Sequence, residues 1–249
     1  EAGGAITLAS NGTITTTGNT TGAGGEVFIH HIAGTAGAIT LGKNITATGG
    51  AGGNGGVVTV LNDQGAIVVD ATIDVSKAGA GTADGSIQLK ARGDITDSAS
   101  GGLIGDLNGN LKAYSTGGRI DLSSSTTNAM KNASFLTDTT TASTNNGSVK
   151  YYDTTDLTLT TVAAGLGTLS SPAGASANLA ATTNGVKTVA GGTNGAVTIR
   201  AGTTGTSTLD VNEAIVTTPS GAGTAGGSVI LEAGGAITLA SNGTITTTG

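Results

Sequence analysis

Apolar and polar residues alternate in short runs along most of this 249-residue chain. Clear examples are "VVTVLN" (57–62), "GAIVVD" (65–70) and "SIQLKA" (86–91), and Gly, Asn or Asp lies at or near the ends of such runs. Alternation with period two, carried by Val, Ile and Thr, predicts half-buried strands. No apolar stripe at helical spacing extends beyond a turn or two. The sequence therefore predicts an all-β protein with almost no helix.

The predicted strands come in groups of three, separated by Gly-rich turns such as "TTGAGG", "GGAGGNGG" and "AGAGTADG". A group of about 30 residues cannot bury its apolar positions alone, but stacked groups bury a continuous core. The pattern predicts a parallel β-helix, a solenoid with three strands per coil and about seven coils, rising about 34 Å at the inter-strand spacing. The alternative is a β-sandwich or an up-and-down barrel, which would need tight hairpins and a closed strand count.

Alternation also predicts which side chains point inward. The expected inward residues, for the first, second and third strands of each group in turn, are Val27, Ile29, Val58, Val60, Ile87, Leu89, Leu111, Ala113, Val149, Tyr151, Val197, Ile199, Val229 and Leu231; Ile6, Leu8, Ile39, Leu41, Ile67 and Val69; and Ile14, Ile45 and Ile73.

The first eighteen residues, "EAGGAITLASNGTITTTG" (1–18), recur without change at 232–249. Chance identity over such a length is negligible. We therefore expect residues 1–231 to be one full β-helical repeat unit and residues 232–249 to be the start of the next identical repeat, in a window from a longer tandem array. Identical repetition suits a fibre, whereas an enzyme has little reason to repeat its unit.

Composition narrows the classes further. The chain has 45 Gly, no Cys and 2% aromatic residues, so we expect a thin aliphatic core without disulfides or thiolate chemistry. Charged residues are only 10% of the chain, and together with the ordered alternation this argues against disorder. A net charge of −6 without a basic stripe argues against nucleic acid as a partner. No apolar run is long enough for a transmembrane helix in this window.

Three phrases, "GAITLASNGTITTTG", "GDITDSASGGLIG" and "GSVILEAGGAITL", resemble the passenger repeats of filamentous-haemagglutinin-type exoproteins. These are giant bacterial surface or secreted proteins exported by two-partner secretion. The resemblance covers nearly the whole chain in style, through a compositional motif. It implies a right-handed β-helix shaft that is extracellular or on the bacterial cell surface and often adhesive.

Long side chains gather at the outward positions of the predicted first strands. Aromatic and basic groups on one flat face could bind a glycan or pack against a neighbouring shaft; a solvated face is the alternative. The residues of this possible binding or packing face are Phe28, His30, Lys90, Lys112, Tyr114, Lys150, Tyr152 and Arg200, with Gln88 and Thr198 between them.

Other motifs carry less chemistry. The tripeptide Arg92-Gly93-Asp94 matches a cell-adhesion motif, but Ile95 starts a predicted strand, so we expect a plain corner between strands. The acidic residues are scattered over turns and strand ends, and pairs such as Asp94 with Asp97 and Asp153 with Asp156 are typical of solvated turns. We therefore expect no catalytic residue, no metal site and no cofactor.

The expected function is a non-catalytic structural shaft of a giant secreted or surface-displayed bacterial fibre or adhesin. Its partners would be further copies of the repeat in the same chain, and neighbouring shafts or cell-surface glycans. One alternative is a laterally packed sheath or coat filament, and a second is a polysaccharide-binding or polysaccharide-cleaving β-helix.

Overall fold

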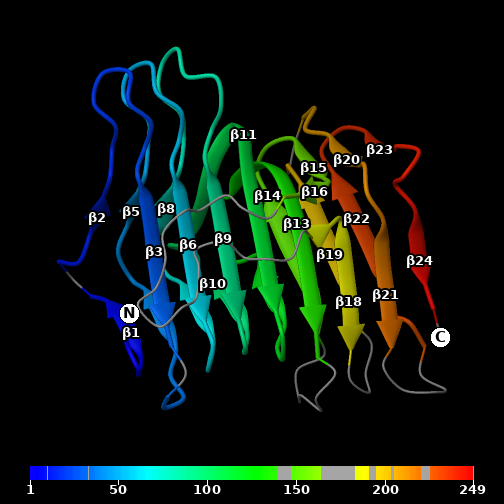
Figure 1. The fold of residues 1–249 in the computed structure, drawn as a ribbon. Helices are drawn as coiled ribbons and strands as arrows, with labels where there is room; N and C mark the ends of the chain where they lie inside the picture. The colour runs from blue at the N-terminus through cyan, green and yellow to red at the C-terminus, as the bar shows by residue number, and fades with distance from the viewer. Residues whose placement is uncertain are drawn as a thin grey trace.

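The computed structural model describes residues 1–9, 11–32, 34–139, 147–163, 183–190, 195–202, 205–219 and 225–248. In this part of the chain every regular element is a β-strand, and all strand pairs but one are parallel. The expectation of an all-β protein is therefore confirmed. None of the described residues forms a helix able to span a membrane. Figure 1 shows the strands side by side, advancing from the N-terminus at one end of the molecule to the C-terminus at the other.

One sheet, called here the eight-strand sheet, consists of eight parallel strands, and between any two successive strands of it the chain passes through the other sheet. Its strands pair in the order β1 (Ile6–Leu8), β4 (Ile39–Leu41), β7 (Ile67–Val69), β10 (Ile95–Asp97), β12 (Ile120–Leu122), β14 (Val149–Asp153), β19 (Val197–Ala201) and β22 (Val229–Ala233).

The second sheet consists of two rows of parallel strands. The β2 row is β2 (Ile14–Thr15), β5 (Ile45–Thr46), β8 (Thr72–Asp74), β11 (Gly102–Ser115), β13 (Ala129–Asp138), β15 (Leu157–Leu159), β20 (Leu209–Val211) and β23 (Ile237–Leu239).

The β3 row shares β11 and β13 with the β2 row, because these two long strands pass through both. It is β3 (Glu26–His31), β6 (Val57–Asn62), β9 (Ser86–Ala91), β11, β13, β18 (Val186–Ala190), β21 (Ile215–Pro219) and β24 (Ile245–Thr247). The antiparallel exception is the short pair β16 (Thr161–Val162) and β17 (Thr183–Asn184).

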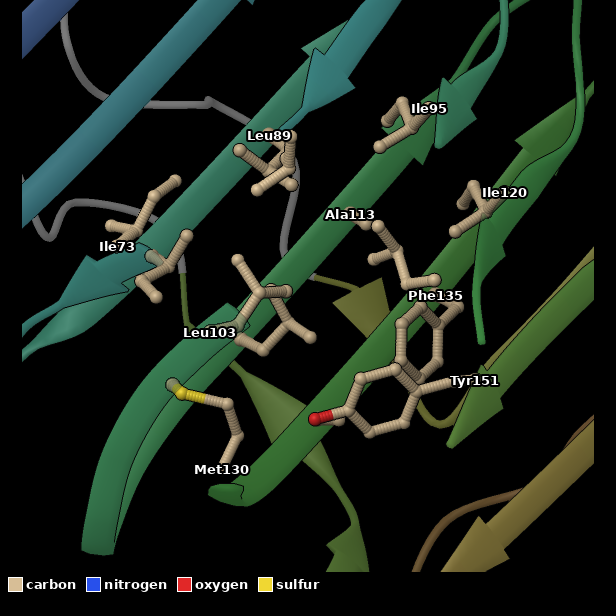
Figure 2. Packing of buried hydrophobic residues seen from close by; sticks show 14 of the residues in the cluster. Ile73, Leu89, Ile95, Leu103, Ala113, Ile120, Met130, Phe135 and Tyr151 are labelled. Carbon is tan, nitrogen blue, oxygen red and sulfur yellow. The ribbon is translucent and has the colours of Figure 1, made fainter. Parts of the chain in front are cut away.

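The registers stack like residues on like residues. In the eight-strand sheet, pairing brings together Ile6, Ile39, Ile67, Ile95 and Ile120 in one continuous line. Aliphatic side chains from all rows meet in a single interior, as Figure 2 shows for strands of the middle of the molecule. Most residues predicted to point inward are buried, and the others pack half-buried against this core: Ile6, Leu8, Ile14, Val229 and Leu231.

Three of the predicted first strands do not join the row that the sequence grouping predicts for them. Val149, Val197 and Val229 point inward as expected, but their strands lie in the eight-strand sheet, because Val149 pairs with Ile120. The cause is the second half of β13, which lies in the β3 row from Phe135 to Asp138 but is not among the predicted strands. The chain thus completes both rows within one strand, and the next strand must join the eight-strand sheet.

Glycine is frequent at the corners because the backbone of each corner lies directly against the backbone of a neighbouring corner. A Cβ atom at Gly56 would lie 2.2 Å from the carbonyl oxygen of Gly25, and one at Gly85 would lie 1.8 Å from that of Gly56. No side chain fits at such distances, so the Gly-rich turns follow from close approach between successive strand levels.

Polar residues occupy one inward position of the β3 row, a feature that the apolar alternation missed. Pairing aligns these residues, called here the inner polar row, with the apolar Ala91 between Asn62 and Ser115, and each is buried: His31, Asn62, Ser115, Thr137, Thr188 and Thr217. Asn62, Thr188 and Thr217 donate to backbone carbonyls of the turn that follows their strand; Asn62 Nδ2 lies 2.7 Å from Ala66 O, and Thr188 Oγ1 lies 2.7 Å from Gly195 O. These bonds fix the turn to the strand before it. Ser115 Oγ instead donates to Gly93 O, in a turn that precedes its strand.

The sequence also predicts two longer coils, near 128–146 and 166–184, and both segments are only partly described. The first contributes β13, and the second ends in β17. Residues 140–146 and 166–182 lie outside the described residues.

We expect Thr188→Val to lower the free energy of unfolding by about 1–3 kcal/mol, because the isosteric side chain leaves a buried carbonyl without its hydroxyl donor. Thr198→Val on the outward side of β19 is the control and should change it by less than about 0.5 kcal/mol. Chemical denaturation measures both. Equal effects would show that the inner polar row is not a stabilising feature.

Candidate functional site

The outward residues predicted to form one face lie on two separate surfaces. Pairing in the β3 row brings together those on β3, β9 and β11, called here the Tyr114 surface: Phe28, His30, Lys90, Lys112 and Tyr114. Those on β14 and β19 belong to the eight-strand sheet and are called here the Tyr152 surface: Lys150, Tyr152 and Arg200. The change of row at β13 that misplaced Val149 is the reason for this correction.

Two residues of the Tyr114 surface, His30 and Lys112, are buried, and the other three are half-buried. His30 is 1% exposed; its ring stacks on Phe28 with centroids 5.6 Å apart, and its Nε2 lies 2.8 Å from Asp63 Oδ2. Lys112 is 0% exposed, and burial and the neighbouring Lys90 lower the pKa of its ammonium group. Burial and nearby buried charge therefore make this surface a poor place for a large ligand.

The Tyr152 surface is an ordered group of outward side chains. Lys150 Nζ lies 4.9 Å from the centroid of the Tyr152 ring, and Arg200 Cζ lies 5.5 Å from it. Tyr152 and Arg200 are paired neighbours in the register, and Arg200 Nε lies 3.8 Å from Glu232 Oε2 on the next strand. Two cations against one ring hold its orientation, since each is attracted by the ring's electron-rich face.

Beside this ring is a hollow of about 280 Å³. Its lining combines one aromatic ring, one guanidinium group and several hydroxyl groups: Ser123, Ser125, Thr126, Tyr152, Asp153, Thr154 and Arg200. Every lining residue carries a polar or charged group, so the hollow suits a polar ligand rather than the apolar ligands of most small-molecule pockets.

Asp153 forms the buried side of the hollow. Its Oδ2 accepts hydrogen bonds from the Tyr151 hydroxyl at 2.5 Å and from the Met130 amide at 2.9 Å, and its Oδ1 accepts from the amide and the hydroxyl of Thr155 at 2.8 Å each. Burial raises the pKa of the Asp153 carboxyl to about 6, although these donors act in the opposite direction. A carboxyl with a pKa near neutrality exchanges its proton in a physiological range.

A buried polar network extends from Asp153 into the core. Tyr151 is 0% exposed and its ring lies 5.1 Å from that of Phe135, so burial and the Asp153 charge raise the pKa of its phenol well above the ordinary value. The Asn128 amide donates to Tyr152 O at 3.1 Å and lies 3.4 Å from Asp97 Oδ2. Burial also raises the pKa of the Asp97 carboxyl.

The sequence expectation of solvated turn carboxylates is therefore wrong for Asp97 and Asp153, which are 9% and 1% exposed. The preceding inward aromatic Tyr151 is the one signal that could have indicated a buried partner. The Arg92-Gly93-Asp94 tripeptide does lie in a corner, between β9 and β10, and Asp94 Oδ1 accepts from the Arg119 amide at 3.0 Å.

Across the described ranges, no three His, Asp or Glu residues lie close enough to hold a metal ion. Comparisons with known proteins find no match: no family model, no curated protein and no solved structure is significantly similar to the chain.

We expect the folded state to lose stability as pH rises from about 4 to about 6. In that window Asp153 keeps its proton in the folded chain, where its pKa is about 6, whereas the unfolded chain has already lost it. The full effect is about 3 kcal/mol, present below the window and lost above it. Denaturant unfolding from pH 4 to pH 7.5 measures the slope.

Asp153→Asn should reduce this slope without removing it, because the raised pKa of Asp97 acts in the same direction. The matched control is Asp210→Asn, on the outward side of β20, which should keep the original slope. An unchanged slope in Asp153→Asn would contradict the assignment.

Proposed function

We propose that this chain is a stretch of right-handed parallel β-helix that forms the non-catalytic shaft of a fibre built from tandem 231-residue units. The observation that carries the proposal is the cyclic order in which the chain visits the eight-strand sheet, the β2 row and the β3 row: β1, β2, β3, then β4, β5, β6, and so on. In the proposed β-helix each cycle is one coil; β11 and β13 each pass through both rows, so their cycles contain two strands and the other cycles have a strand in each row. Strand residues of the inner coils pair with the coil before and the coil after.

The dimensions follow from this order. The eight strands from β1 to β22 have seven intervals between them, which gives a rise of about 34 Å. A right-handed path is favoured because parallel strands joined by crossovers are right-handed in nearly all proteins.

Continuation into a further unit is favoured by apolar residues at the last coil. Ile237, Leu239 and Ile245 are 41%, 49% and 43% exposed. Their counterparts in the first copy of the repeated segment are Ile6, Leu8 and Ile14. Ile6 and Ile14 stack on Ile39 and Ile45, which are both fully buried. A following unit would supply the copies of these partners and cover the open coil, and in such a stack only the terminal coils keep free strand edges that invite aggregation.

The setting of such a fibre is proposed from the resemblance to filamentous-haemagglutinin-type exoproteins: secreted, or displayed on a bacterial surface. Hydrogen bonds directed along the axis make a stiff shaft, and repetition multiplies weak contacts so that avidity can replace single-site affinity. A laterally packed coat is the alternative.

A chain of two units, residues 1–231 twice followed by residues 1–18, tests the tandem stacking. In this chain Ile237→Asp should cost several kcal/mol, because it places a charge under the next unit. In the one-unit chain the same change should cost less than about 1 kcal/mol, since the position is half-exposed there. Chemical denaturation gives both values.

Small-angle X-ray scattering provides the accompanying measurement of shape. The two-unit chain should be longer by about 35 Å at an unchanged cross-section. Equal small costs of Ile237→Asp in both chains, or a second unit that leaves the length unchanged, would contradict stacking.

The Tyr152 surface favours glycan binding as a second function of the same shaft. An aromatic ring with Lys150 and Arg200 beside it, next to a hollow lined by hydroxyl groups, suits a sugar ring that bears a carboxylate. The chain as a whole is acidic, so this local pair of cations would direct such a ligand to one place.

We expect Arg200→Gln to weaken binding of a uronic-acid polymer about tenfold, or about 1.4 kcal/mol, through loss of a charged hydrogen bond. Arg119→Gln is the matched control, since Arg119 is exposed and lies beside Asp94 away from the hollow. Isothermal titration calorimetry measures both, and equal weakening would indicate unspecific attraction of charge.

A further inference from the structure

The two identical segments of the chain occupy different sheets. Ile6, in the first copy, pairs with Ile39 in the eight-strand sheet, whereas Ile237, its counterpart in the second copy, pairs with Leu209 in the β2 row. Identical residues therefore lie on different sides of the core, although their local sequence is the same over eighteen positions.

Two further pairs of counterparts change place in the same sense. Ile14 lies in the β2 row, but Ile245 lies in the β3 row. Ala2 forms a bridge with His31 of the β3 row, but Ala233 pairs with Ala201 in the eight-strand sheet. All three pairs move forward by one step in the order in which the chain visits the rows.

The shift has an identifiable origin in β13. Before this strand, the chain begins each group of three strands in the β3 row, as at β3, β6 and β9. After it, the corresponding first strands, β14, β19 and β22, lie in the eight-strand sheet. The unit thus contains a whole number of coils and one strand more.

We infer that successive 231-residue units present the same residues on successive faces of the fibre, advanced by one face per unit. This rests on the proposed tandem fibre. With three faces, a given side chain turns by about a third of a circle from one unit to the next and returns to its first face after three units. The rotation comes from the strand count of the unit and needs no twist of the shaft.

The shift decides which kind of partner the outward surfaces fit. A flat coat needs each unit to offer the same side to a neighbouring shaft, but the Tyr152 surface would face three directions in three consecutive units. Such a display fits partners that surround the fibre, such as glycan chains from several directions. It excludes continuous lateral packing of two straight shafts through that surface.

Distances between paired spin labels test the shift in the 249-residue chain itself. The chain has no cysteine, so introduced thiols are labelled alone, and Thr7, Thr15 and Thr238 are all exposed outward residues. Thr7 and Thr238 are counterparts in the two copies, whereas Thr15 and Thr238 lie in the same β2 row. The two variants carry Thr7→Cys with Thr238→Cys, and Thr15→Cys with Thr238→Cys.

We expect the same-row pair, Thr15 and Thr238, to be the closer one, at about 34 Å plus the reach of the labels. The counterpart pair, Thr7 and Thr238, should be longer by several ångströms, because its labels project from different faces. The reverse order would overturn the inference, since counterparts in phase would stand directly above one another along the axis.

Circular dichroism identical to that of the cysteine-free chain is the control for folding. If the Thr7→Cys variant does not fold, Thr40→Cys replaces it, because Thr40 lies one strand further along the same sheet. The same order of distances is expected after correction for its shorter separation along the axis. The outcome is independent of the two-unit experiment, because Ile237 would be covered by a following unit on whichever face it lies. Failure of the tandem fibre and failure of the shift are therefore distinguishable.

Discussion

Parallel backbone pairing between successive levels of the chain is the constraint on which the structure depends. Once Ile39 stands on Ile6 and Ile67 stands on Ile39, each position must accept whatever the levels on either side place there. Lines of isoleucine satisfy this requirement in the core. Glycine satisfies it at corners, where a Cβ atom at Gly85 would meet the carbonyl of Gly56. The unusual composition, rich in Gly and poor in aromatic residues, is thus a consequence of stacking.

The same constraint makes polar residues acceptable inside, provided that they too are stacked. The inner polar row places polar groups one above another except at Ala91. Thr188 and Thr217 each donate to a carbonyl of the turn that follows their strand, and Ser115 donates to a carbonyl of an earlier turn. The Asp153 network is different, because it is local. A carboxyl buried beneath Tyr151 retains a raised pKa, and the chain satisfies its oxygens with four donors rather than exposing it.

The sequence predicts whether a side chain points inward or outward, but it does not predict which row its strand joins. Alternation at Val149 and Tyr151 correctly predicts that both point inward, because that depends on two neighbouring residues. Which row their strand joins depends on every strand before it, and a single long strand, β13, changes the count for the rest of the chain. The division of the outward face into the Tyr114 and Tyr152 surfaces has the same cause. The burial of Asp153 also escaped prediction, since "YYD" reads equally well as the exposed end of a strand.

A strand count that is not a multiple of three also bears on why such a fibre would be built from long units. If each unit ended in phase, every copy of Tyr152 would lie on one side of the proposed fibre. Advancing by one face would distribute these copies around the axis, so that they could not line up to pack two shafts together. In the proposed fibre, the β13 region would therefore act on every unit that follows: it would leave the stacking within a unit intact while it sets the direction of each later surface.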